Sequence, residues 1–88
     1  MVCVVYSSSS CPQCQVLKQY LHDKGITHNE RIIEEPEARV DALMLNIYST
    51  PALVINEHVL HQTEMFQNGH LDESVLLAFL RRFEHGKA

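Results

Sequence analysis

The sequence predicts a small α/β domain in which a four-stranded mixed β-sheet carries helices on both faces. Apolar segments with strand and helix periods alternate along the chain in the order β-α-β-α-β-β-α. The β-α-β start implies a right-handed crossover between parallel strands, and two short apolar segments later in the chain predict an antiparallel hairpin. Because the chain has 88 residues, of which 45% are hydrophobic, we expect one domain with its own core over residues 1–88.

The first half of the chain holds two predicted strands and two predicted helices. Residues 2–6 are a continuous apolar run typical of a buried strand, and the helix after them has an apolar face and ends at Gly25. Residues 26–33 predict a second strand. A proline flanked by acids in residues 34–37 marks the next helix, which runs to about Asn46. We expect a set of apolar residues on or near its buried side: Ala38, Val40, Leu43, Met44 and Ile47.

The second half opens with the predicted hairpin. Residues 52–55 and 58–61 predict two strands, and residues 56–57 (Asn-Glu) predict the two-residue turn between them. The pair Thr63-Glu64 predicts the cap of a short helix that ends at Asn68-Gly69.

A last helix closes the predicted fold. Asp72 is its expected N-cap, because a carboxylate there accepts hydrogen bonds from the unpaired N–H groups of the first turn. Apolar residues recur along this helix at a helical spacing, which predicts core packing and not a partner surface. These residues are Val75, Leu76, Phe79, Leu80 and Phe83.

Composition excludes several classes of partner. The net charge is −4 and there is no basic run, which argues against nucleic acid. No apolar stretch approaches the roughly 20 residues of a membrane span. The polar residues 7–10 interrupt the first apolar run, and no basic segment precedes it, so we expect no secretory signal. Three cysteines, one of them unpaired, suit a reducing compartment, and we expect a cytoplasmic monomer.

The motif that carries chemistry is Cys11-Pro12-Gln13-Cys14, at the predicted junction of the first strand and helix. Unpaired N–H groups and partial positive charge at a helix start stabilise a thiolate. We therefore expect the pKa of the Cys11 thiol to lie below its ordinary value of about 8.5. Pro12 suits the first helical position. Cys11 is then predicted to attack a disulfide, and Cys14, one turn further, to resolve the mixed disulfide.

Two cysteines at this spacing also occur in zinc sites, which need two more ligands. Cys3 is the only other cysteine, and it lies in a predicted buried strand, where we expect a small core residue. The six histidines are scattered, and the close pair His58 and His61 is spaced more tightly than zinc ligands. The context therefore favours a redox dithiol, and we expect no metal and no tightly bound cofactor.

The whole chain resembles the glutaredoxin branch of the thioredoxin superfamily. The resemblance rests on the cysteine motif after the first strand, on Pro51 before the third, and on residues 34–39 (Glu-Glu-Pro-Glu-Ala-Arg), which are similar to the second-helix start of many small members. It implies a thioredoxin-like, glutaredoxin-type fold and a cis peptide between Thr50 and Pro51. It also implies that the backbone of Thr50 pairs with an extended substrate, while Pro12 and Gln13 form the active-site loop.

The chain departs from the family at three positions that usually serve glutathione. A lysine before the first cysteine, an aromatic residue before the second and a Gly-Gly pair after the fourth strand are replaced by Ser8, Gln13 and His61-Gln62. The resemblance still implies that the next pair, Thr63-Glu64, holds the amino-acid end of a γ-glutamyl group. Arg39 is either a substitute for the missing lysine charge or a solvated surface residue.

A glutamine before the second cysteine also resembles the glutaredoxin-like redoxins that serve ribonucleotide reductases and take electrons from a thioredoxin reductase. Those redoxins typically carry a Trp-Ser-Gly-Phe segment after the fourth strand, whereas this chain has no tryptophan. The electron donor is therefore either glutathione or a reductase.

The sequence predicts a glutaredoxin-like dithiol-disulfide oxidoreductase in redox homeostasis. We expect it to reduce protein disulfides or glutathione mixed disulfides through the Cys-Pro-Gln-Cys centre, with glutathione as one of two candidate co-substrates, the other being a reductase. One alternative is an iron–sulfur cluster or metal-binding carrier that uses Cys11. Another is a non-catalytic adaptor whose dithiol is unreactive.

Overall fold

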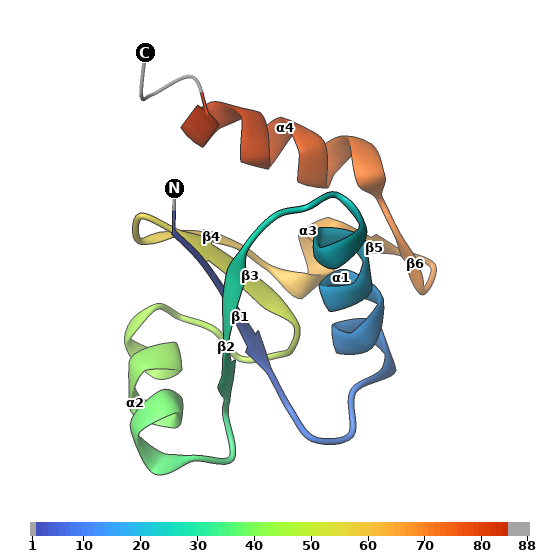
Figure 1. Cartoon of the computed structure of the whole chain (residues 1–88). Coiled ribbons are helices and arrows are strands. Elements are labelled where there is room, and N and C mark those ends of the chain that lie inside the picture. The colour runs from blue at the N-terminus through green and yellow to red at the C-terminus, as the bar shows by residue number, and fades with distance from the viewer. Residues whose placement is uncertain (1, 85–88) are drawn as a thin grey trace.

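Strands and helices alternate through most of the computed structural model, which describes residues 2–84 (Figure 1). The elements are, in chain order, β1 (Cys3–Ser7), α1 (Pro12–Asp23), β2 (His28–Ile32), α2 (Pro36–Met44), β3 (Ala52–Ile55), β4 (His58–Leu60), α3 (Gln62–Met65), β5 (Phe66–Gln67), β6 (His70–Leu71) and α4 (Glu73–Glu84). No helix within residues 2–84 is long and apolar enough to cross a membrane.

The main sheet has the strand order β2-β1-β3-β4. Strand β1 pairs with β2 in parallel and with β3 antiparallel, so that Val5 lies between Glu30 and Leu53. Strands β3 and β4 form the predicted hairpin, and both turn residues, Asn56 and Glu57, have positive φ angles, as a two-residue turn of the I′ type requires. The predicted four-stranded mixed sheet is confirmed.

Alternation along β1 divides the core between the two faces of the sheet. Cys3 and Val5 face a cluster that includes side chains of α1, α3 and α4. Val4 and Tyr6 face a smaller cluster that includes Ala42 of α2. Figure 1 accordingly shows α2 across the sheet from α1 and α3. The helices therefore cover both faces, as the sequence predicted.

The last helix follows its predicted pattern. The side chain of Asp72 accepts a hydrogen bond from the backbone N–H of Val75 at 3.3 Å, which is an N-cap contact. The apolar stripe faces the core, since three of its members are buried and two pack against them: Leu76, Phe79 and Leu80, then Val75 and Phe83. The stripe therefore packs into the core, as predicted.

The predicted buried face of α2 is partly wrong. Ala38, Ala42 and the following Ile47 are buried, but the larger apolar residues on the helix are exposed: Val40 by 55%, Leu43 by 51% and Met44 by 77%. Ala38 and Ala42 are four positions apart, so they define one stripe, and the larger residues lie around the other side of the helix. The helix packs through small side chains and leaves large ones in solvent.

The segment after β4 also differs from the prediction. The N-cap of α3 is His61 and not Thr63, and α3 ends at Met65. The residues that follow form a second hairpin, in which Phe66 faces Leu71 across the turn Asn68-Gly69. Both turn residues have positive φ, which asparagine and glycine tolerate best. An Asn-Gly pair is typical of a hairpin turn, but here it was interpreted as the end of a helix, so the hairpin was not predicted.

Packing of α1 gives a direct test of the fold. Leu17 is fully buried, whereas its neighbour Val16 is 47% exposed. We expect Leu17→Ala to lower the free energy of unfolding by about 2–5 kcal/mol, because it leaves a cavity. Val16→Ala, the matched control, is expected to change it by about 0.5 kcal/mol or less. Urea denaturation of both variants measures this, and equal losses would contradict the described packing.

Candidate active site

The two cysteines of the motif lie at the N-terminus of α1, as predicted. Cys11 is the N-cap residue, with an extended backbone, and Pro12 takes the first helical position. The sulfur of Cys11 accepts a hydrogen bond from the backbone N–H of Cys14 at 3.0 Å. A disulfide joins the two residues, with their Cα atoms 5.2 Å apart. Cys11 is partly exposed and Cys14 is fully buried, so of the two only Cys11 is open to solvent.

The loop before β3 brings a second donor to the sulfur of Cys11. The hydroxyl of Thr50 donates to this sulfur at 3.7 Å, and Ser8 and Thr50 share a hydrogen bond of 3.0 Å between their hydroxyl oxygens. The Thr50–Pro51 peptide is cis, which confirms the expectation drawn from the resemblance. The sulfur of Cys11 therefore accepts hydrogen bonds from two donors, the backbone N–H of Cys14 and the hydroxyl of Thr50.

A surface hollow of about 510 Å³ opens beside Cys11, and we refer to it as the dithiol hollow. Its lining residues are all uncharged: Ser8, Ser10, Cys11, Pro12, Gln13, Thr50 and Gly69. Gly69 comes from the turn between β5 and β6 and is not among the predicted site residues. The Asn-Gly signal could have placed a hairpin turn here, although not its position beside the dithiol.

The active-site loop is tied to α3 by a pair of glutamines. The side-chain N–H of Gln62 donates to the carbonyl oxygen of the Gln13 side chain at 2.7 Å. The predicted pair Thr63 and Glu64 lies next in the chain but does not line the dithiol hollow. The Glu64 carboxylate instead accepts from the backbone N–H of His61 at 2.8 Å, which caps α3. A role for these two residues in glutathione binding stays a prediction.

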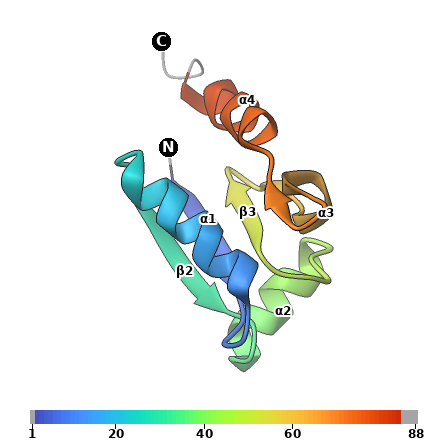
Figure 2. The ribbon, with the colours of Figure 1, turned by 90° about the vertical axis from the view of Figure 1, so that its right-hand side faces the viewer.

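A polar cluster fastens α1 to the sheet one turn beyond Cys14. The hydroxyl of the buried Ser7 donates to the carboxylate of Glu30 at 2.6 Å, and the ammonium of Lys18 contacts the same oxygen at 2.6 Å. Figure 2 shows α1 running alongside β2, the strand that carries Glu30. The hydrogen bond from Lys18, followed by that from Ser7, holds the pKa of Glu30 below its usual value. No pattern in the sequence indicates this cluster.

The loop that leads into Cys11 is held from the other side. Both the backbone N–H and the hydroxyl of Ser9 donate to the carboxylate of Glu34, at 3.1 and 2.8 Å. These two hydrogen bonds, the backbone one first, hold the pKa of Glu34 below its ordinary value. The loop from β1 to α1 is therefore anchored at Ser8 by Thr50 and at Ser9 by Glu34.

The third cysteine takes no part in the site. Cys3 is a free thiol in the core, as predicted, and burial raises the pKa of its thiol, which makes it a poor nucleophile. Within residues 2–84 no group of three or more histidine, cysteine or acidic side chains is placed to hold a metal ion. His85, one of the six histidines, lies outside the described residues.

The fold and the dithiol at the start of α1 define a thioredoxin-like protein with a thiol redox site. The family follows from the sequence: the glutaredoxin family model matches residues 3–60, which include both cysteines of the motif and Pro51. The chain belongs to the glutaredoxin family. This membership, together with the Cys11–Cys14 pair, indicates a thiol-disulfide redox function.

Solved structures share the fold of this chain. A mutant of the thioredoxin-like protein BC3987 is 25% identical, with a TM-score of 0.72 over 89% of this chain and 97% of that one. The unmutated BC3987 structure is 28% identical, with a TM-score of 0.60 over 67% and 84%. Glutaredoxin 1 from Francisella tularensis, solved with cacodylate, has the same fold, with a TM-score of 0.63 at 20% identity over 91% and 96%. A search of curated proteins found no match.

The cluster under α1 predicts a pH dependence of stability. Because the pKa of Glu30 is lowered on folding, its carboxylate stabilises the protein above the ordinary pKa of about 4.3, and this contribution disappears as the pH falls below that value. Glu30→Gln is expected to cost about 1 kcal/mol at pH 7, since the pair is partly screened by solvent.

Urea denaturation of the wild type and of Glu30→Gln from pH 7 to pH 3 measures this effect. The difference in unfolding free energy between the two proteins should shrink as the pH falls below about 4.3. A difference that stays constant, or grows, over that range would show that Glu30 is not stabilised as a carboxylate in the folded protein.

Proposed function

We propose that the protein is a dithiol-disulfide oxidoreductase that reduces protein disulfides or glutathione mixed disulfides. Cys11 is the nucleophile and Cys14 the resolving residue. The observation that carries the proposal is the unequal setting of the two sulfurs. Cys11 is open to the dithiol hollow and receives hydrogen bonds from Cys14 and Thr50, whereas Cys14 is fully buried behind it.

The reaction begins with both cysteines reduced. The thiolate of Cys11 attacks one sulfur of the substrate disulfide, the substrate S–S bond breaks, and the leaving sulfur departs as a thiolate that takes up a proton. Cys11 and the substrate are then joined by a mixed disulfide. Cys14 loses its proton and attacks the Cys11 sulfur, which releases the second substrate thiol. Two electrons have passed to the substrate, and the Cys11–Cys14 disulfide is the oxidised product.

Renewed activity requires an external two-electron donor. Two glutathione molecules or the dithiol of a reductase would return the pair to its reduced form, each through the same exchange chemistry. Under this proposal no cofactor is tightly bound, and glutathione is a co-substrate where it serves as this donor. The cytoplasm, whose thiols are kept reduced, is the proposed location, and a monomer is the proposed form.

Removal of the resolving sulfur should trap the intermediate. Reduced Cys14→Ser protein, mixed with an excess of a disulfide substrate such as glutathione disulfide, is expected to form a stable adduct on Cys11, because no second thiol can displace the substrate. Intact-mass and peptide-mapping mass spectrometry detect this adduct. Cys11→Ser is the matched control and should form far less adduct, since Cys14 is buried. A folded Cys14→Ser protein that forms no adduct contradicts the proposed chemistry.

A further inference from the structure

We propose that a second hollow, between α2 and the loop before β3, binds an apolar side chain of a protein substrate close to the disulfide that Cys11 attacks. We refer to it as the α2 hollow. Its lining residues are Ile33, Arg39, Ala42, Leu43, Ile47, Tyr48, Ser49 and Thr50. The inference rests on the proposed function and narrows its substrate class to an extended protein segment with an apolar residue beside its cysteine.

The walls of the α2 hollow suit an apolar side chain. Ala42 and Ile47 are buried in it, whereas Leu43 and Tyr48 are 51% and 77% exposed. Large apolar side chains gathered around a hollow, and left in water, are typical of surfaces that bind another molecule. The hollow is about 290 Å³ in volume, which exceeds what one leucine or phenylalanine side chain requires.

The α2 hollow adjoins the dithiol hollow at Thr50, which lines both. The hydroxyl of Thr50 lies 3.7 Å from the Cys11 sulfur and donates to it. A substrate segment that crosses Thr50 in an extended form therefore has its cysteine at Cys11 and a neighbouring side chain at the α2 hollow. Extended chain advances about 3.3 Å per residue, so this side chain belongs to a residue within two or three positions of the cysteine.

The α2 hollow has one charged lining residue, and its charge predicts a second chemical feature of the substrate, an acidic group. Arg39 is its charged lining residue, and the guanidinium is held by a hydrogen bond from its Nε to the carbonyl oxygen of Ile33 at 3.2 Å. Within residues 2–84 Arg39 makes no ion pair. The charge of Arg39 helps to lower the pKa of Glu34, but the Glu34 carboxylate already accepts two hydrogen bonds from Ser9. A carboxylate next to the apolar side chain would meet this cation.

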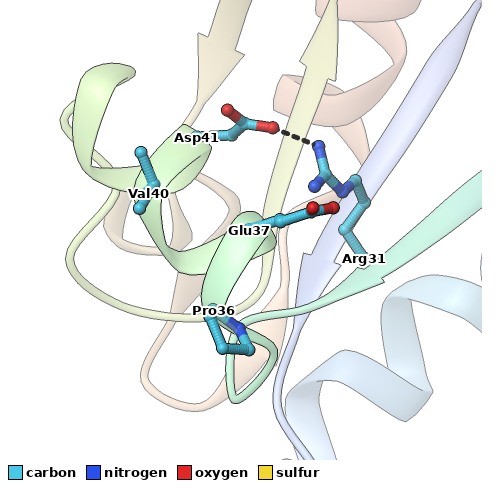
Figure 3. A pocket seen from close by; sticks show the side chains of 5 residues that line it. All are labelled: Arg31, Pro36, Glu37, Val40 and Asp41. Atoms are coloured by element: carbon cyan, nitrogen blue, oxygen red, sulfur yellow. Dashed lines mark hydrogen bonds and ion pairs between the residues drawn. The ribbon is translucent and has the colours of Figure 1, made fainter.

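The other arginine near α2 is already paired and offers no such site. Arg31 donates to the carboxylate of Asp41 at 2.6 Å, and Figure 3 shows this pair beside Glu37, with Val40 directed away from it. The hollow drawn there is lined by Arg31, Pro36, Glu37, Val40 and Asp41, and none of these residues lines the dithiol hollow. The charge of Arg39, unpaired within residues 2–84, and the shared residue Thr50 therefore both favour the α2 hollow over the hollow at Arg31.

Peptide disulfides test the proposal. Each probe is an extended peptide whose single cysteine is joined to cysteamine by a disulfide. One peptide has a leucine and a glutamate near the cysteine, the second has serine for the leucine, and the third has lysine for the glutamate. The leucine is placed in turn at each position within three residues of the cysteine, on either side.

Cystamine, which carries no side chain, is the reference substrate. The release of peptide thiol by reduced protein is followed, and each rate is divided by the rate of the same protein with cystamine.

At the best position, the wild type is expected to prefer leucine over serine by about tenfold, the order expected for an apolar pocket. Leu43→Ala and Tyr48→Ala should reduce this preference towards one. Met44→Ala is the matched control, because Met44 is apolar, is more exposed than Leu43 (77% against 51%), follows Leu43 directly, and does not line the hollow. It should keep the full preference. Arg39→Gln should remove the preference for glutamate over lysine and leave the preference for leucine.

Glutathione disulfide has carboxylates but no apolar side chain. It therefore tests whether the α2 hollow binds an apolar side chain or only a carboxylate. Leu43→Ala should therefore slow the leucine peptide much more than glutathione disulfide. Equal slowing of both substrates, equal loss of preference in Met44→Ala, or a wild type without preference at any position would overturn the inference while the oxidoreductase activity stands. A wild type that fails to reduce cystamine or any peptide would instead overturn the proposed function.

Discussion

The hydrogen bond from the backbone N–H of Cys14 to the sulfur of Cys11 fixes the geometry on which the site depends. It makes a sulfur atom the N-cap of α1, so that an otherwise unpaired donor is satisfied and the sulfur lies at the positive end of the helix. The same turn places Cys14 on the packed side of α1, where it is fully buried. One turn of helix thus gives two chemically equal residues unequal access to a substrate.

The sheet determines what else surrounds Cys11. Antiparallel pairing of β1 with β3 sets Tyr6 opposite Ala52, so the residues just after β1 lie beside those just before β3. This register brings Ser8 and Thr50 together and puts the Thr50 hydroxyl next to the sulfur. Buried side chains of α1 and the cluster of Ser7, Lys18 and Glu30 then hold the helix against the sheet. The reactive turn is preorganised by contacts on both of its sides.

Local patterns were enough to predict the order of elements from β1 to β4, the helix start at Pro12 and the role of Asp72 as a cap. They failed where packing decides. The face of α2 was misassigned because the helix packs through Ala38 and Ala42, and size alone favoured the larger residues as the buried ones.

Long-range contacts within the site could not be predicted from the sequence either. The bridge between Gln13 and Gln62 joins residues 49 positions apart, and the Ser7–Glu30 hydrogen bond depends on how β1 and β2 pair. Neither contact has a periodic or motif signal in one sequence. The position of Gly69 beside the dithiol likewise depends on how the second hairpin folds back.

The central claim is that the first turn of α1 makes Cys11 the reactive thiol and shields Cys14. The most direct measurement is the rate at which iodoacetamide alkylates each cysteine in the reduced, folded protein as a function of pH. Peptide mapping identifies which cysteine has reacted. Cys11 is predicted to react many times faster than Cys14 and to become reactive at a lower pH than a free cysteine, whose pKa is about 8.5. Equal rates at the two positions, or faster reaction at Cys14, would contradict the account.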